Sequence, residues 1–285
     1  MEAVMLGTII RDLYGKQETH EIKYALDDIA SPNDTYGFSS VGVYCYFNPE
    51  DSTALYIGLA RDLTQRFCHH NGVIKVKPES CKVREITAWF TEHEKLGLAI
   101  FVQSPLEQIS TSRNAKKRSK NTGEHSDSPL EGLLHATTME GILIESYKAK
   151  HGSLPPWNKT GASLTGQGLA TTGGYNLLEI MTGKVDSLIL SRKTLRELSD
   201  DPTFLEFESL LHGGRTYATA QHAGRGMDSR AILSAMNEIT ASPFLADMHT
   251  QATWKRMLDT QYLFLQSPAP ATEETPGRLR LKGKR

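Results

Sequence analysis

Between residues 40 and 160 the chain carries polar side chains that could together hold a phosphate group and act on it: Tyr44, Tyr56, Arg66, His70, Glu140 and Asn158. Arg66 and His70 are four residues apart in a segment, 61–70, that has helical character. At about 100° per residue they lie within about 40° of each other on one helix face. Two donors aimed together suit a phosphate, and a solvated basic face is the alternative.

Glu140 is the carboxylate best placed to hold a metal ion. A helix is predicted over about 130–150, and Glu140 lies within about 60° of its apolar stripe. The stripe consists of Leu133, Ala136, Leu143, Ile144 and Tyr147. A carboxylate buried without a partner is costly, and a divalent cation is a natural partner. Glu145 lies about 140° around the helix and is predicted to be a surface residue; a salt bridge inside the helix is the alternative for Glu140.

Two predicted strands place the tyrosines. Val41–Phe47 alternates, and Ala54–Gly58 follows a turn-forming segment, so the two form an antiparallel hairpin. In this hairpin Leu55 and Ile57 share the aliphatic face, and Tyr44 and Tyr56 share the other. Tyrosines are common in the cores of sheets, which is the alternative for both. Asn158 has its own alternative, as a turn residue after two prolines.

Four pieces of sequence, in this order, resemble the GIY-YIG nuclease family. They are Gly42-Val43-Tyr44; Tyr56-Ile57-Gly58 followed by Leu63, Arg66 and His70; Glu140-x-x-Leu143-Ile144-x-x-Tyr147; and Pro156-Trp157-Asn158. The resemblance covers about 120 residues and leaves both ends of the chain unexplained. The intervals from Arg66 to Glu140 and from Glu140 to Asn158 are longer than in compact members of the family.

The resemblance implies a DNA endonuclease that cuts phosphodiester bonds with one Mg²⁺ or Mn²⁺ ion. Glu140 would hold the metal, Tyr44 would activate or position the attacking water, and Arg66 would stabilise charge on the phosphorane. Tyr56 and His70 would orient the water and the phosphate, and Asn158 would brace the site. A catalytically degenerate member that only binds nucleic acid is the alternative. Restriction, repair and mobile-element roles all stay open.

Contacts with DNA beyond the scissile phosphate are expected from local clusters of positive charge. Residues 110–129 hold five basic against two acidic side chains, including Lys116, Lys117 and Arg118. Arg192 and Lys193 lie in a second basic cluster, and the end of the chain after Pro276 carries basic residues without acids. A core ending near Gly174 is expected to nick DNA with poorer site selection. The alternative is a C-terminal region that only packs or dimerises.

The predicted fold class is α/β (α+β): a small three-stranded, mainly antiparallel sheet with flanking helices, followed by a mainly helical region. Leu98–Val102 is the predicted third strand, and a short helix is predicted near Ile9–Tyr14. The predicted divisions are an N-terminal extension (1–37), a nuclease domain (38–165) with a basic insertion (110–129), a helical C-terminal region (175–266) and a disordered basic tail (267–285).

The composition of the chain limits the classes of partner that it is expected to bind. With 39% hydrophobic and 23% charged residues and a net charge of −1, the 285-residue chain is typical of a globular protein. It contains neither an apolar run long enough for a membrane helix nor a phosphate-binding loop followed by Lys-Ser/Thr. We therefore expect DNA as partner, no membrane and no nucleotide cofactor. No signal peptide is expected, and Cys45, Cys68 and Cys81 are interpreted as reduced cytoplasmic thiols. Cutting both DNA strands would require a homodimer or sequential nicking.

Overall fold

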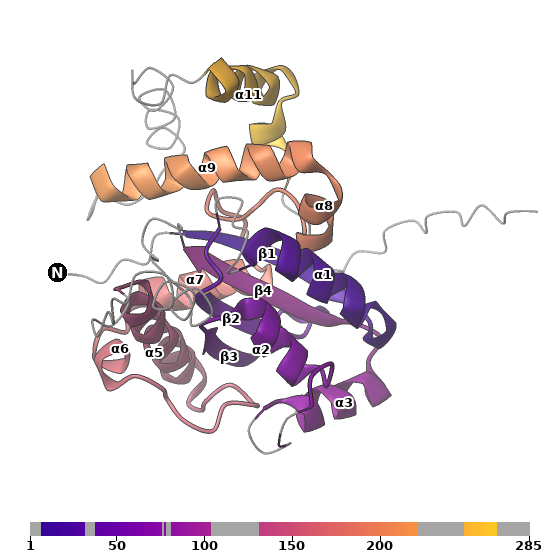
Figure 1. Cartoon of the computed structure of the whole chain (residues 1–285). Coiled ribbons are helices and arrows are strands. Elements are labelled where there is room, and N and C mark those ends of the chain that lie inside the picture. Colours follow the sequence, from indigo (N-terminus) through magenta and orange to yellow (C-terminus); the bar gives the residue numbers. More distant parts are fainter. Residues whose placement is uncertain are drawn as a thin grey trace, which may run out of the picture.

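An antiparallel four-stranded sheet forms the centre of the computed structural model (Figure 1). The structure describes residues 7–31, 38–75, 77, 81–103, 131–221 and 248–266. The strands are β1 (Gly7–Tyr14), β2 (Gly42–Phe47), β3 (Ala54–Ala60) and β4 (Leu96–Gln103), in the order β1-β4-β2-β3. The α+β class is confirmed, and the expectation of three strands is wrong because β1 was missed.

β1 lies where a short helix near Ile9–Tyr14 was predicted. Both faces of this strand are buried: Ile10 and Tyr14 belong to the hydrophobic cluster on one face of the sheet, and Ile9 belongs to the cluster on the other. A strand buried on both faces shows no polar alternation, so its apolar pairs four residues apart look like a helical stripe. The residues expected to form an extension thus supply an edge strand.

Helices cover both faces of the sheet (Figure 1). One face packs against α1 (Thr19–Ala30), α2 (Leu63–His70) and α8 (Leu195–Asp200), and α3 (Val83–Glu92) lies beside α2. The opposite face packs against α5 (Glu131–His151) and α7 (Thr172–Thr182), with the short helix α6 (Leu164–Gly168) on α5. The layered core therefore holds elements from β1, near the start of the described chain, to α8.

The alternation predicted for β2 is confirmed. Tyr44 and Tyr46 lie in the cluster under α1 and α2, while Val43, Cys45 and Phe47 lie in the cluster under α5 and α7. The prediction for Leu55 is wrong, because its side chain packs with the tyrosine face. The register between β2 and β3 shifts next to it, at Tyr46/Phe47, and such a bulge redirects side chains.

The segment after residue 175 shares the core of the sheet. Leu178 and Met181 of α7 and Leu190 belong to one hydrophobic cluster, and Leu195 and Leu198 of α8 belong to the other. The outer edge of β1 is covered as well: the Ile9 amide donates to the Ile189 carbonyl, and the Ser191 amide donates to the Ile9 carbonyl, both at 2.8 Å. Covering a free edge in this way prevents pairing with other chains.

A second attachment joins α9 (Pro202–Gln221) to β1, along which it runs (Figure 1). Arg215 and Glu208 of α9 form a buried ion pair at 3.0 Å, and Arg215 also donates to the Thr8 hydroxyl of β1 at 2.9 Å. α9 in turn packs against α11 (Met248–Asp259) through a small third cluster that includes Phe207 and Met257. Among the described helices, none combines the length and the apolar character needed to cross a bilayer.

Candidate active site

Two tyrosines and a histidine meet on the face of the sheet covered by α2. Tyr44 Oη lies 2.7 Å from His70 Nε2, and the ring centroids of Tyr44 and Tyr56 are 5.8 Å apart. Tyr56 contacts His70 as well, at 5.7 Å between centroids. Gly58 makes this packing possible, since a Cβ at that position would fall 2.7 Å from Tyr44 Oη. The glycine of the Tyr-Ile-Gly sequence is therefore needed for close approach of the tyrosine ring.

The helix α2 aims Arg66 toward the same cluster. Asp62 caps α2 by accepting a hydrogen bond from the Gln65 amide at 2.8 Å, which fixes where the helix begins. The positive charge of Arg66 acts on the hydroxyls of both Tyr44 and Tyr56. In the described part of the chain, the half-buried Arg66 guanidinium takes part in no hydrogen bond or ion pair.

The outer edge of β3 holds the other two predicted residues. The Asn158 side chain accepts from the Ile57 amide at 2.9 Å and donates to the Ile57 carbonyl at 2.8 Å, so it imitates a neighbouring strand. Two residues further along β3, the Leu59 amide donates to Glu140 Oε1 at 3.1 Å. The Trp157 amide donates to the carbonyl of Leu55, the residue of this edge that precedes Ile57, at 2.9 Å. The edge strand thereby fixes both Glu140 and Asn158 beside Tyr56 and Gly58.

The Glu140 carboxylate is half-buried at the edge of β3. Burial among apolar residues raises its pKa, and the Leu59 amide and the Arg66 charge oppose that shift. No cluster of three or more His, Cys, Asp or Glu side chains occurs in the described ranges. A single carboxylate still fits Mg²⁺, which commonly takes one or two carboxylates and completes its shell with water and substrate phosphate. Glu145 points elsewhere and pairs with Lys148 at 3.3 Å.

The protonation states of the cluster follow from its burial. Burial raises the pKa of Tyr44 well above its ordinary value, and the positive charge of Arg66 partly opposes this. The pKa of Tyr56 is raised for the same reason, with Arg66 again opposing. Burial lowers the pKa of His70 to about 3, and the charges of Arg66 and Lys82 add to the effect. At neutral pH the cluster therefore consists of two phenols and a neutral imidazole.

The residues predicted to bind DNA outside this cluster are placed differently. Lys116, Lys117 and Arg118 lie outside the described residues. Arg192 pairs with Asp186 at 3.0 Å, and Lys193 pairs with Glu197 at 3.2 Å. Both basic residues follow the segment that covers β1, the edge of the sheet opposite β3. Three strand spacings, roughly 14 Å, separate the two edges, so these two residues lie away from the tyrosine cluster.

Two neighbours of the cluster, Lys82 and Asn71, were not predicted from the sequence. Lys82, the residue before α3, donates its main-chain amide to His70 Nδ1 at 2.8 Å, and its ammonium lies 4.9 Å from the centroid of the Tyr56 ring. Because this contact depends on how the chain returns after α2, neither periodicity nor spacing could reveal it. Asn71 was also missed: its amide donates to the Tyr46 hydroxyl at 3.3 Å and its oxygen accepts from the Tyr14 hydroxyl at 2.9 Å.

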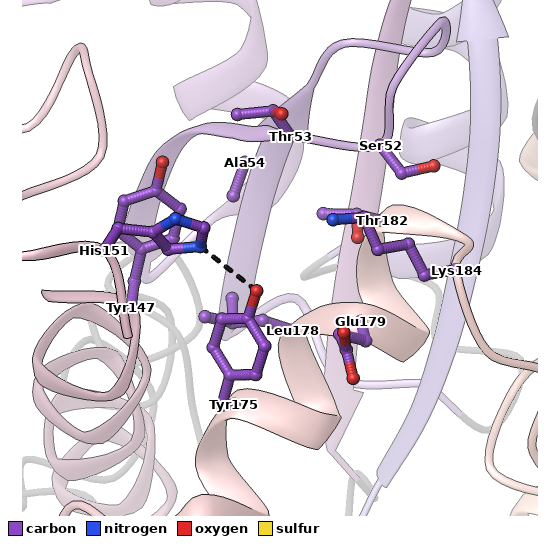
Figure 2. Close-up of a pocket in the computed structure, with 10 residues that line it drawn as sticks. All are labelled: Ser52, Thr53, Ala54, Tyr147, His151, Tyr175, Leu178, Glu179, Thr182 and Lys184. Atoms are coloured by element: carbon purple, nitrogen blue, oxygen red, sulfur yellow. Dashed lines mark hydrogen bonds between the residues drawn. The ribbon is translucent and has the colours of Figure 1, made fainter. Parts of the chain in front are cut away.

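A small hollow lies on the other face of the sheet, between α5, α7 and the start of β3 (Figure 2). Its lining includes Tyr147, His151 and Tyr175, and the His151 ring is within 3.1 Å of the Tyr175 hydroxyl. The volume of about 20 Å³ accommodates one water molecule. It is too small for a nucleotide and shares no residue with the tyrosine cluster.

The six side chains singled out from the sequence thus lie along β3 and on the helices and strand that adjoin it: Tyr44 on β2, Tyr56 on β3, Arg66 and His70 on α2, Glu140 on α5 and Asn158 after α5. We call this set the tyrosine–glutamate site. Comparisons with protein-family models, with curated proteins and with solved structures found no match to this chain.

Proposed function

We propose that the chain is a metal-dependent endonuclease that hydrolyses DNA phosphodiester bonds, as its resemblance to the GIY-YIG nucleases implies. The observation that carries the proposal is the tyrosine–glutamate site. It combines a half-buried guanidinium, a neutral histidine that is hydrogen-bonded to Tyr44 and in ring contact with Tyr56, and a half-buried carboxylate held at a strand edge. These groups serve phosphate hydrolysis: a donor for the phosphate, hydroxyls that can position the water, and a metal ligand.

In this proposal each side chain has a distinct task. Arg66 binds the scissile phosphate and stabilises the charge that develops on its oxygens. Tyr44 and Tyr56 position the attacking water through their hydroxyls, while Asn158 keeps β3 in place through Ile57. A Mg²⁺ ion on Glu140 would polarise the phosphate when bound. The products would be a 5′-phosphate and a 3′-hydroxyl.

The proposal is tested by incubating the purified chain with supercoiled plasmid DNA in Mg²⁺ or Mn²⁺ and in excess chelator. Nicked or linear plasmid that appears only with metal supports an endonuclease, and sequencing the ends would separate a restriction-type enzyme from a repair or mobile-element nuclease. Linear product at an early time would favour a homodimer over sequential nicking. DNA binding without cleavage would support the degenerate alternative.

Arg66→Lys is expected to lower the cleavage rate by about a hundredfold or more, because a point charge replaces a planar pair of donors on phosphate. The variant should bind plasmid DNA nearly as well as the wild type, because one positive charge is retained. Initial rates at saturating DNA measure the effect. A rate within twofold of the wild type would show that Arg66 contributes only net charge.

Tyr44→Phe is expected to lower the cleavage rate by about a hundredfold or more, since it removes the hydroxyl that bonds His70. Tyr46→Phe is the matched control: it deletes a hydroxyl from an equally buried tyrosine of the same strand face, whose described partner is Asn71. Its rate should fall less than about tenfold. Equal losses in the two variants would mean that the Tyr44 hydroxyl has no particular role in the reaction.

A further inference from the structure

The main-chain amide of Lys82 determines which nitrogen of His70 carries a proton. It donates to His70 Nδ1 at 2.8 Å, and both residues are buried. An amide can donate only to a nitrogen without hydrogen, so Nδ1 must be unprotonated. The neutral ring then carries its hydrogen on Nε2. Since Nε2 lies 2.7 Å from Tyr44 Oη, His70 is the donor and the Tyr44 oxygen the acceptor.

The same reasoning leaves the hydrogen of the Tyr44 hydroxyl available. Once the Tyr44 oxygen accepts from His70, its own hydrogen is free to be donated. The hydrogen bonds therefore run one way, from the Lys82 amide through His70 to the Tyr44 oxygen. Tyr56 lies beside this chain of donors, with its ring centroid 5.8 Å from that of Tyr44, and is the more exposed of the two tyrosines.

The side chain of Lys82 acts on Tyr56. Its ammonium lies 4.9 Å from the centroid of the Tyr56 ring and pairs with Glu85 at 3.2 Å. The Lys82 side chain is 9% exposed, so its charge is poorly screened by solvent. A cation over the face of a phenol stabilises the electron-rich ring, and more so when the phenol gives up its proton.

We infer that Lys82 is a positioning residue of the tyrosine–glutamate site: its amide sets the direction of the hydrogen bonds through His70 to Tyr44, and its ammonium supports Tyr56. This inference rests on the proposed function. The two contributions are separable, because Lys82→Met keeps the amide and removes the charge, whereas Lys82→Pro removes both. Lys23→Met is the matched control for loss of a cation over a tyrosine, since the Lys23 ammonium lies 4.4 Å from the Tyr24 ring outside the site.

The test combines a spectrum with kinetics on the full chain. In long-range proton–nitrogen correlation spectra of histidine-labelled protein, the His70 ring should show the Nε2–H tautomer in the wild type and in Lys82→Met. Lys82→Pro should show a mixture of tautomers. We expect plasmid cleavage to fall several-fold in Lys82→Met and about ten- to a hundredfold in Lys82→Pro, a loss typical of residues that orient a functional histidine through its second ring nitrogen. Cleavage by Lys23→Met should equal that of the wild type.

A wild-type His70 in the Nδ1–H tautomer would overturn the inference, and so would equal cleavage rates in the wild type and both Lys82 variants. The wild-type spectrum decides the first point even if Lys82→Pro fails to fold. Because the tautomer is observed without DNA or metal, the spectrum is independent of nuclease activity. A wild type that shows the Nε2–H tautomer yet cuts no DNA would count against the proposed function alone.

Discussion

Glu140→Gln is expected to reduce DNA cleavage about a thousandfold or more while leaving the fold as stable as the wild type, or more stable, at pH 7. Loss of a metal ligand removes several kcal/mol of transition-state stabilisation, and each 1.4 kcal/mol is tenfold in rate. Glutamine is close in size to glutamate, and its oxygen can still accept from the Leu59 amide, so the edge of β3 keeps its partner.

The effect of Glu140→Gln on stability should depend on pH in a defined direction. Burial raises the pKa of Glu140 in the folded protein above its ordinary value. The stability contributed by such a group is present below the ordinary pKa and is lost as pH rises through the raised pKa. At pH 7 the ionised carboxylate therefore costs stability that the amide does not. In metal-free buffer the melting temperature of Glu140→Gln should exceed that of the wild type more at pH 7 than at pH 4.

Glu145→Ala is the matched control, because Glu145 lies on the same helix and its ion-pair partner among the described residues is the exposed Lys148. Its cleavage rate should stay within about twofold of the wild type, since exposed ion pairs contribute little. Plasmid cleavage rates and thermal melts of both variants provide the measurement. An inactive Glu145 variant together with an active Glu140 variant would show that the metal had been assigned to the wrong face of α5.

The parts of the site that could be predicted are those set by local geometry. A hairpin alternates its side chains, which placed Tyr44 and Tyr56 on one face, and a helix repeats nearly every four residues, which placed Arg66 beside His70. The same periodicity separated Glu140 from Glu145. Such relations involve residues close in sequence, so one sequence is enough to derive them.

The parts that could not be predicted join distant segments. Asn158 meets Ile57 across 101 positions, and that pairing depends on β3 being an edge strand. Lys82 reaches His70 only because the chain returns beside α2. β1 was mistaken for a helix because both of its faces are buried. α7 begins at Thr172, before the predicted helical region, because its first turn is rich in threonine and glycine, residues that favour loops.

A chain ending at Gly174 is expected to lose its fold and with it all cleavage activity, which reverses the expectation drawn from the sequence. The truncation removes five side chains that are at most 2% exposed: Leu178, Met181, Leu190, Leu195 and Leu198. At about 1.5–3 kcal/mol for each buried side chain, the loss is on the order of 10 kcal/mol, comparable to the whole stability of a typical domain. It also leaves Ile9 of β1 without its partners at Ile189 and Ser191.

A chain ending at Gln266 is the matched control, since it removes basic residues while leaving every described element in place. It should melt cooperatively near the wild-type temperature. If the removed segment touches phosphates, the slope of log K against log salt should become shallower by about 0.9 for each phosphate of duplex DNA that the shorter chain no longer neutralises. Circular dichroism melts and binding titrations at several salt concentrations measure both effects. A chain ending at Gly174 that melts cooperatively and still nicks plasmid would contradict this prediction. It would show that α7 and α8 are dispensable, because the sheet would then stay folded without the leucines that cover β1 and the tyrosine face.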